Sequence, residues 1–203
     1  VLIKILNMDN LLEFLQVWNS IPHLEPCAQQ SLREMAFLWN IVRQLQPKNI
    51  IEIGVAMGGS SVLWELAAPS AKQFLIDRVE ESSRLKRILR KGQDFVFYDS
   101  HNRETKEQIK KNLNGENVDF LFIDGDHSYE GAKMDYEMYG ELVTKGVIAF
   151  HDTVSCATVN KLWSEISKTT NMDIINQYRD FCTAEVIFPR TDRTPNLTGT
   201  GII

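Results

Sequence analysis

A run of strand-forming residues that ends in charged groups is the first candidate for chemistry in this sequence. Asp119–Gly131 reads DFLFIDGDHSYEG. Residues 118–123 have the apolar composition of a strand covered on both faces, and Asp124, Asp126 and His127 follow where that strand stops. Ligands bind at the carboxyl edge of an open parallel sheet, so we expect chemistry here. The alternative is a polar turn, since Asp-Gly is a common turn dipeptide.

A second apolar run, GVIAFHD, ends in His151 and Asp152. If the two strands are neighbours, about 4.8 Å apart, their ends bring Asp124 beside this pair. Two carboxylates and an imidazole form a candidate site for a divalent cation. Magnesium prefers oxygen ligands, so His151 either shifts the choice toward manganese or iron or is not a ligand. Asp152 could instead cap the following turn through Thr153 or Ser155.

The stretch IIEIGVAMGGSS, residues 50–61, has the composition of a strand, a glycine-rich turn and a helix start. Gly54 allows a sharp turn, and Gly58 allows a ligand to approach the helix N-terminus. The spacing is G-x-x-x-G-G and not the G-x-G-x-x-G of dinucleotide-binding proteins. Asp77 ends the next strand, where a carboxylate can accept hydrogen bonds from the ribose of an adenosine. The alternative is a turn that needs glycine for its backbone alone.

The elements that would position these residues alternate between strands and helices. Strands are predicted at 49–54, 73–77, 95–99, 118–124 and 146–152. Helical patterns occupy about 59–68, 80–91, 104–112, 129–143 and 156–168. This alternation predicts a parallel sheet with helices on both faces. Two further strands, 172–178 and 184–188, are joined too closely for a crossover helix and must be antiparallel.

The predicted fold class is therefore α/β, with a doubly wound, seven-stranded and mostly parallel sheet. Helices at 9–20 and 27–45 precede the first strand. We expect residues 1–46 to form an N-terminal helical cap and residues 47–203 to form the cofactor-binding catalytic domain.

Bulk composition excludes several classes of protein. The 203 residues carry a net charge of −5, which argues against a dedicated nucleic-acid or anionic-membrane binder. No apolar run approaches the length needed to span a bilayer. Cys27, Cys156 and Cys182 are few and widely spaced, so neither a disulfide framework nor a thiolate zinc site is indicated. A reduced, cytoplasmic setting is the expectation.

Taken together, the motifs resemble class I S-adenosylmethionine-dependent methyltransferases. That family carries E-x-G-x-x-x-G-x-S after the first strand, an acidic residue ending the second strand and an aspartate near the end of the third. This chain shows Glu52-Ile53-Gly54, Gly58-Gly59-Ser60, Asp77 and Asp99-Ser100. The stretches FIDGDHSYEGAKMDYEMY and GVIAFHDT look like the small-molecule O-methyltransferase branch, which includes macrolide-sugar and cephalosporin-biosynthesis enzymes. The resemblance covers about residues 28–188.

The resemblance implies S-adenosylmethionine as the cofactor and assigns positions to its contacts. The residues implied for its methionine end are Gly54, Gly58 and Ser60, that for the ribose is Asp77, and those for the adenine are Asp99 and Ser100. Glu52 would add a favourable field for the sulfonium cation.

The resemblance also bears on the reacting groups. Metal-dependent members hold magnesium or manganese at the positions of Asp124 and of the pair His151-Asp152, although His151 departs from their acidic pattern. In related sugar O-methyltransferases a histidine at the place of His127 acts as general base, and a neutral imidazole can take a hydroxyl proton near pH 7. His151 is the alternative base.

The sequence therefore predicts an O-methyltransferase that acts on a hydroxyl of a sugar or small natural product. One alternative is an oxygenase or hydroxylase with iron at His127, His151 and Asp152, and another is a nonenzymatic module that kept the fold. A small-molecule acceptor is the expected partner, with neither nucleic acid nor membrane. A homo-oligomer is compatible with aromatic residues such as Trp18 and Trp39, which could serve a dimer contact as easily as a core.

Overall fold

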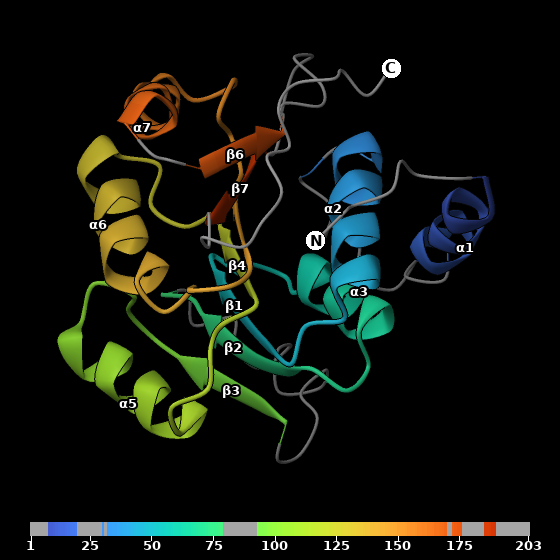
Figure 1. The fold of residues 1–203 in the computed structure, drawn as a ribbon, viewed down its shortest axis with the longest axis horizontal. Coiled ribbons are helices and arrows are strands. Elements are labelled where there is room, and N and C mark those ends of the chain that lie inside the picture. Colours follow the sequence, from blue (N-terminus) through green and yellow to red (C-terminus); the bar gives the residue numbers. More distant parts are fainter. Residues whose placement is uncertain are drawn as a thin grey trace.

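A seven-stranded sheet forms the centre of the protein in the computed structural model (Figure 1). The structure describes residues 8–19, 30, 32–78, 93–169, 172–175 and 185–189. The strand order is β3-β2-β1-β4-β5-β7-β6. The strands are β1 (Asn49–Ile53), β2 (Lys72–Ile76), β3 (Asp94–Phe97), β4 (Phe120–Ile123), β5 (Val147–Phe150), β6 (Met172–Ile175) and β7 (Glu185–Pro189).

The strands from β3 to β5 run parallel to one another, and β7 runs antiparallel to both β5 and β6. The α/β class and the parallel strands predicted from the sequence are thus confirmed. All residues of β1, β4 and β5 are buried, which explains their nearly continuous apolar composition. The helix predicted at 80–91 lies outside the described residues.

The register of the parallel strands brings their C-terminal ends to one edge. Ile53 of β1 lies opposite Ile123 of β4, which in turn lies opposite Phe150 of β5. The ladder continues one residue further, because Asp124 N donates to Ile53 O at 2.8 Å and His151 N donates to Ile123 O at 3.0 Å. The charged residues that follow β4 and β5 are therefore neighbours in space.

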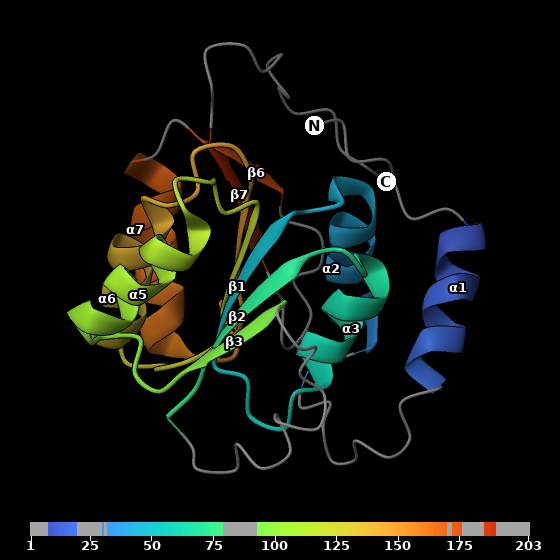
Figure 2. The same ribbon diagram turned by 90° about the horizontal axis from the view of Figure 1, so that it is seen from below.

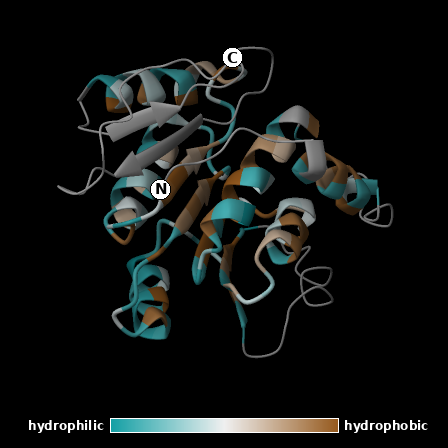
Figure 3. Ribbon diagram, turned by 45° about the vertical axis from the view of Figure 1, so that its right-hand side comes forward, coloured by the Kyte–Doolittle hydropathy of each residue, from teal (hydrophilic) through white to brown (hydrophobic). Residues whose placement is uncertain are grey.

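Helices cover both faces of the sheet, as Figure 2 shows. One layer contains α1 (Met8–Asn19), α2 (Leu32–Leu45) and α3 (Gly59–Ala67). The other contains α5 (Arg103–Leu113), α6 (Tyr129–Gly140) and α7 (Ala157–Thr169). Apolar residues concentrate on the central strands, and hydrophilic residues lie on the outer surfaces of the helices (Figure 3).

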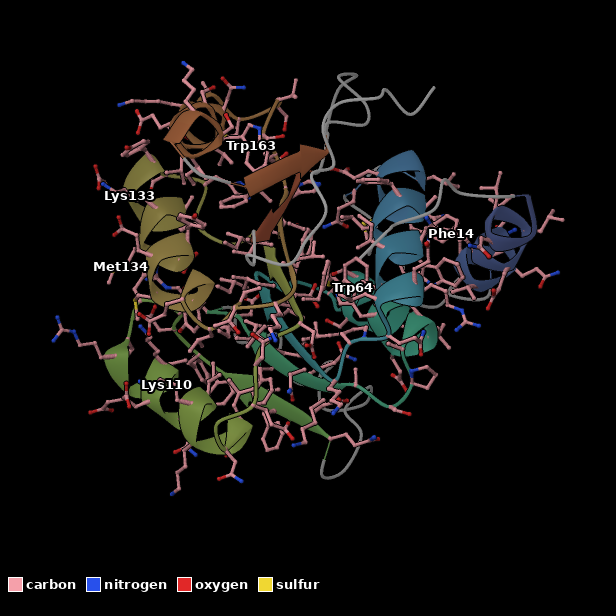
Figure 4. All side chains as sticks on the ribbon, viewed as in Figure 1. Phe14, Trp64, Lys110, Lys133, Met134 and Trp163 are labelled. Atoms are coloured by element: carbon pink, nitrogen blue, oxygen red, sulfur yellow. The ribbon has the colours of Figure 1, made fainter. Side chains whose placement is uncertain are left out.

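The N-terminal helices share a hydrophobic core with the sheet. Trp64 of α3 meets Phe120 and Phe122 of β4 edge-on, with ring centroids 5.3 and 5.6 Å apart. Phe14 of α1 packs against Trp39 of α2 at 5.8 Å and against Trp18 at 5.6 Å, and Figure 4 shows Phe14 directed toward α2. Both tryptophans therefore contribute to packing within the chain. The division at residue 46 stays a prediction.

The opposite face is built from α6 and α7. Trp163 of α7 packs against Phe150 of β5 with centroids 5.6 Å apart, while Lys110, Lys133 and Met134 point away from the sheet (Figure 4). Asn102 caps α5 by accepting a hydrogen bond from Glu104 N at 2.9 Å, as its residue type favours. Among the described helices, none combines the length and apolar character needed to cross a membrane.

Candidate active site

The glycine-rich turn between β1 and α3 is held against the end of β4. Gly54 has φ +85°, and a Cβ there would overlap the carbonyl group of Asp124 and lie 2.7 Å from Gly125 N. Gly58 has φ +81° and forms the N-cap of α3. Only glycine adopts such dihedrals without a steric cost. The two glycines therefore have a backbone role, and Gly54 also permits the close approach to β4.

Asp77, which follows β2, fastens this turn. Its Oδ2 accepts hydrogen bonds from Val55 N at 2.7 Å and from Ala56 N at 2.6 Å. Ala56 has φ +45°, a region that a residue other than glycine adopts only when its surroundings support it. The carboxylate of Asp77 thus stabilises the turn and also lines the cavity beside it.

Glu52 is buried between β1 and α3 and does not line this cavity. The hydroxyls of Ser60 and Ser61 both donate to its carboxyl group, the latter at 2.6 Å. Burial raises the pKa of Glu52 to about 8, although the two serine hydroxyls oppose that shift. Because a carboxyl with this pKa keeps its proton at neutral pH, the electrostatic role expected from the sequence gains no support.

We expect the buried Glu52 carboxyl to make the protein less stable as pH rises. The folded state holds the proton up to about pH 8, whereas the unfolded chain releases it near pH 4.5. Stability is therefore lost between these values, by up to several kcal/mol since each pKa unit is about 1.4 kcal/mol. Thermal unfolding of the wild type and of Glu52→Gln from pH 5 to pH 8 measures this loss.

The Glu52→Gln variant should lose most of that pH dependence, because its amide is neutral throughout. Replacement of the exposed Glu107 by glutamine should keep the wild-type pH dependence. Parallel profiles for the wild type and Glu52→Gln would contradict the assignment.

A cavity of about 580 Å³ opens at the C-terminal edge of the sheet, within the usual size range of ligand pockets. The loops after β1 to β5 all contribute to it. The predicted site residues in its lining are Gly54, Ser60, Asp77, Ser100, Asp124, His127, His151 and Asp152. Glu52, Gly58 and Asp99 are not among its lining residues. The strands thus bring together residues that lie almost one hundred positions apart.

The segment after β3 forms the wall of the cavity on the side of α6. The backbone carbonyl of buried Ser100 accepts a hydrogen bond from Tyr139 Oη at 2.7 Å. Asp99 Oδ1 accepts from His101 N at 3.0 Å. The His101 ring lines the cavity and lies 3.2 Å from the carboxylate of the fully buried Asp135. His101 is therefore anchored to α6 as well as present at the rim.

Asp124, His151 and Asp152 offer ligand atoms that all lie within 4.8 Å of one another. His151 Nδ1 is 3.1 Å from Asp124 Oδ1 and 3.2 Å from Asp152 Oδ2. Burial lowers the pKa of His151, but the nearby carboxylates have the larger combined effect and raise that pKa to about 12. His151 in turn lowers the pKa of Asp152 to about 2. The cluster thus concentrates negative charge that a cation can neutralise.

Asp152 is both a member of this cluster and part of a turn. It has φ +57°, its side chain accepts a hydrogen bond from Ser155 Oγ, and its carbonyl accepts one from Cys156 N at 3.1 Å. The capping role that the sequence left open is therefore real. It coexists with the contact between Asp152 Oδ2 and His151.

His127 lies on the open side of the cluster. Its Nε2 is 3.4 Å from Asp124 Oδ1 and 3.3 Å from Asp152 Oδ2. The hydrogen bond with Asp124 raises the pKa of His127 above its usual range, although partial burial opposes that shift. The His127 side chain is 47% exposed and the His151 side chain only 5%. Of these two rings, His127 is the accessible one.

Sequence reasoning missed two residues near the start of α2. Glu34 Oε2 lies 3.3 Å from His151 Nε2, and Gln30 Nε2 donates to Asp124 Oδ2 at 2.8 Å. The signal in the sequence is their spacing of four positions in the pattern of the predicted helix, with Leu32 between them. The tertiary fold alone shows that α2 reaches the ends of β4 and β5.

Comparisons with known proteins agree with this geometry. The sequence pattern of a family described as a methyltransferase domain matches residues 51–153. The uncharacterized protein y4gI of Sinorhizobium fredii is 26% identical in an alignment of 164 positions that covers 74% of this chain. The chain spans only 18% of the length of that curated relative.

Two solved structures show the same fold. A protein from Staphylococcus aureus assigned as a caffeoyl-CoA O-methyltransferase has a TM-score of 0.64 and 20% identity, with 86% of this chain and 91% of that one covered. An O-methyltransferase from Bacillus cereus in complex with SAH has a TM-score of 0.60 and 18% identity, with 92% of each chain covered.

The family match spans more than half of the chain and contains the glycine-rich turn, Asp77 and Asp124. The resemblance inferred from the motifs is thereby confirmed. The chain belongs to the methyltransferase domain family, and its fold is that of the S-adenosylmethionine-dependent methyltransferases.

Proposed function

We propose that this protein transfers a methyl group from S-adenosylmethionine to a hydroxyl of a sugar or small natural product, assisted by a divalent cation. The observation that carries the proposal is one cavity lined by two chemically distinct sets of residues. The glycine-rich turn and the carboxylate of Asp77 form one set, and His127 with the neighbouring acidic cluster forms the other. The O-methyltransferase names of the two similar structures support oxygen as the accepting atom.

S-adenosylmethionine, when bound, supplies an electrophilic methyl group and a neutral thioether leaving group. Ser60 and the turn would face its methionine end, Asp77 the ribose hydroxyls, and Ser100 the adenine. Asp99 would act beside Ser100 from outside the cavity lining, and Gly58 would shape the helix start. All these roles come from the family resemblance, and the lining of the cavity supports those of Ser60, Asp77 and Ser100.

The acidic cluster fits a divalent cation. His151 Nδ1 is buried and makes no well-directed hydrogen bond, although two carboxylate oxygens lie within 3.2 Å of it. Asp124, His151 and Asp152 would hold magnesium or manganese there. Such a cation supplies Lewis-acid polarisation, which lowers the pKa of a nearby hydroxyl.

His127 is the proposed general base. Its neutral imidazole would accept the hydroxyl proton of the acceptor as the acceptor oxygen takes up the methyl group. Asp124 and Asp152, both near the Nε2–H of that ring, would stabilise the imidazolium that results. His151 is disfavoured as base because both of its ring nitrogens face carboxylates inside the fold.

The oxygenase alternative gains no support from the cluster. It requires His127, His151 and Asp152 around one iron, whereas the group found among the described residues is Asp124, His151 and Asp152. It also leaves the part of the cavity lined by the glycine-rich turn and Asp77 without a ligand.

The function is tested by calorimetry with S-adenosylhomocysteine, followed by a screen of sugars, catechols and other small hydroxyl compounds with a methyl-labelled donor. We expect saturable binding at one site per chain and label transfer to oxygen. Absence of S-adenosylhomocysteine binding to the folded protein would reject the proposal, and label on nitrogen or carbon would reject the O-methyl assignment.

Replacement of Asp77 by alanine should weaken S-adenosylhomocysteine binding by at least about tenfold, because a hydrogen bond to a charged group contributes about 1.5–3 kcal/mol. Calorimetry measures the affinity, and thermal unfolding shows whether the fold survives. Asp77→Asn is the informative partner variant, since its amide oxygen can still accept from Val55 N and Ala56 N. If Asp77 only supported the turn, the asparagine variant would bind like the wild type.

A further inference from the structure

Glu34 and His151 form a buried contact between α2 and the end of β5. Glu34 Oε2 lies 3.3 Å from His151 Nε2 with hydrogen-bonding geometry. The two side chains are only 3% and 5% exposed. A buried carboxylate is costly unless its partner compensates for the lost hydration, so this contact needs a physical reason.

The two ring nitrogens of His151 face different surroundings. Nε2 points to one carboxylate on α2 and satisfies the geometry of a hydrogen bond. Nδ1 lies at similar distances from Asp124 Oδ1 and Asp152 Oδ2, 3.1 and 3.2 Å, but hydrogen-bonds to neither with good geometry. Nδ1 and a carboxylate oxygen from each aspartate lie close enough together for one cation to contact all three.

A histidine that binds a metal through one nitrogen usually donates its other N–H to a carboxylate or carbonyl, which fixes the tautomer and the ring orientation. Glu34 has this relation to His151 Nε2. A proton fixed on Nε2 leaves the lone pair of the neutral ring on Nδ1, which faces Asp124 and Asp152.

We infer that Glu34 is a positioning residue for the cation site, which holds His151 in the Nε2–H tautomer so that Nδ1 serves as a metal ligand. The inference rests on the metal assistance included in the proposed function. It also assigns the site a preference, because imidazole ligands suit zinc, iron, nickel and copper, whereas magnesium prefers oxygen ligands. A transition-metal ion is therefore the expected occupant.

Gln30 extends the same arrangement to a carboxylate ligand. Its side-chain amide donates to Asp124 Oδ2 at 2.8 Å, which leaves Asp124 Oδ1 directed toward His151 and His127. Two of the three ligand side chains are thus oriented by residues that precede β1. Residues of the N-terminal part of the chain therefore help to position the proposed metal ligands.

The inference is tested by titrating the metal-depleted full chain with Mn²⁺, followed by electron paramagnetic resonance and calorimetry. Glu34→Leu removes the acceptor, and its dissociation constant for Mn²⁺ should rise about 10–100-fold. Glu34→Gln keeps an amide oxygen that can accept from Nε2, so its affinity should lie between those of the wild type and Glu34→Leu. Glu13→Gln, an exposed carboxylate paired with Arg43, should match the wild type.

A spectroscopic measurement separates positioning from a general structural effect. Nitrogen NMR of the ¹⁵N-histidine-labelled protein with Zn²⁺ should report the Nε2–H tautomer of His151 in the wild type and in Glu34→Gln. S-adenosylhomocysteine affinity should be unchanged in both Glu34 variants. If Glu34→Leu does not fold, Glu34→Gln decides by its reduced Mn²⁺ affinity.

Failure of the inference is distinguishable from failure of the proposed function. Wild-type Mn²⁺ affinity in both Glu34 variants, or an Nδ1–H tautomer in the Zn²⁺-bound wild type, would overturn the role of Glu34 alone. A wild type that binds S-adenosylhomocysteine but neither Mn²⁺ nor Zn²⁺ would overturn the metal site and this inference with it. Metal binding without S-adenosylhomocysteine binding would reject methyl transfer and leave the role of Glu34 intact.

Discussion

Replacement of His127 by alanine is expected to lower the rate of methyl transfer by about 10²–10⁴-fold, the usual contribution of a positioned general base. The reason is geometric: His127 is the exposed imidazole of the cluster, and its Nε2 lies within 3.4 Å of both Asp124 and Asp152. The measurement is the initial rate with labelled donor and an acceptor identified in the screen. Affinity for S-adenosylhomocysteine and for Mn²⁺ should change little.

The pH dependence of the rate identifies the base. A base must be neutral to accept a proton, so the rate should fall as pH drops below the pKa of His127. The hydrogen bond with Asp124 raises that pKa. The acidic limb of the pH–rate profile, where the rate falls with falling pH, is therefore expected to have its midpoint above pH 6.5, the ordinary pKa of histidine. The limb should vanish in His127→Ala, whose residual rate should rise with pH as hydroxide replaces the base.

His151→Ala is the matched comparison for His127→Ala. It should keep the acidic limb but lose Mn²⁺ affinity, because His151 Nδ1 is a proposed ligand and its ring is buried. A His127→Ala enzyme with the wild-type rate, or loss of the limb in His151→Ala alone, would transfer the role of base to His151.

Replacement of Gly54 by alanine is expected to destabilise the fold severely. A left-handed residue other than glycine costs about 1–2 kcal/mol, and at Gly54 the added Cβ would also overlap the carbonyl group of Asp124. Backbone atoms of two adjacent strand ends cannot move apart without breaking the ladder between β1 and β4. We therefore expect a loss of more than about 4 kcal/mol, which falls in the range of exceptional point mutations.

Gly115 offers a control with the same backbone conformation. Its φ is +82°, close to that of Gly54, but a Cβ there would meet nothing within 4 Å. Gly115→Ala should lower the free energy of unfolding only by the cost of the left-handed backbone, about 1–2 kcal/mol. Its affinity for S-adenosylhomocysteine should stay at the wild-type value. Urea unfolding and calorimetry of the two variants separate the dihedral cost from the overlap. Equal stabilities of the two variants would show that the approach of Gly54 to Asp124 is not essential.

The order of the elements and the edge of the sheet that carries the candidate site could be predicted from the sequence alone. Runs such as FLFI in β4 are apolar throughout because both faces of the strand are covered, so the α/β class follows from local composition. The polar groups that end β4 and β5 could be assigned to one edge because parallel strands present their C-terminal ends together. Element ends differ by a few residues, as for β4, which begins at Phe120 and not at residue 118.

The exposure and the contacts of these groups could not be predicted from the sequence, because they depend on tertiary packing. Burial distinguishes His151 from His127, and no local pattern in the sequence encodes the exposed fraction of a side chain. Glu52 fits a cofactor motif by position, yet its carboxyl turns toward the serines of α3, because strand residues alternate between faces and the packing of α3 selects the partner. Glu34 reaches His151 across 117 positions, a contact that exists only because α2 packs beside the sheet.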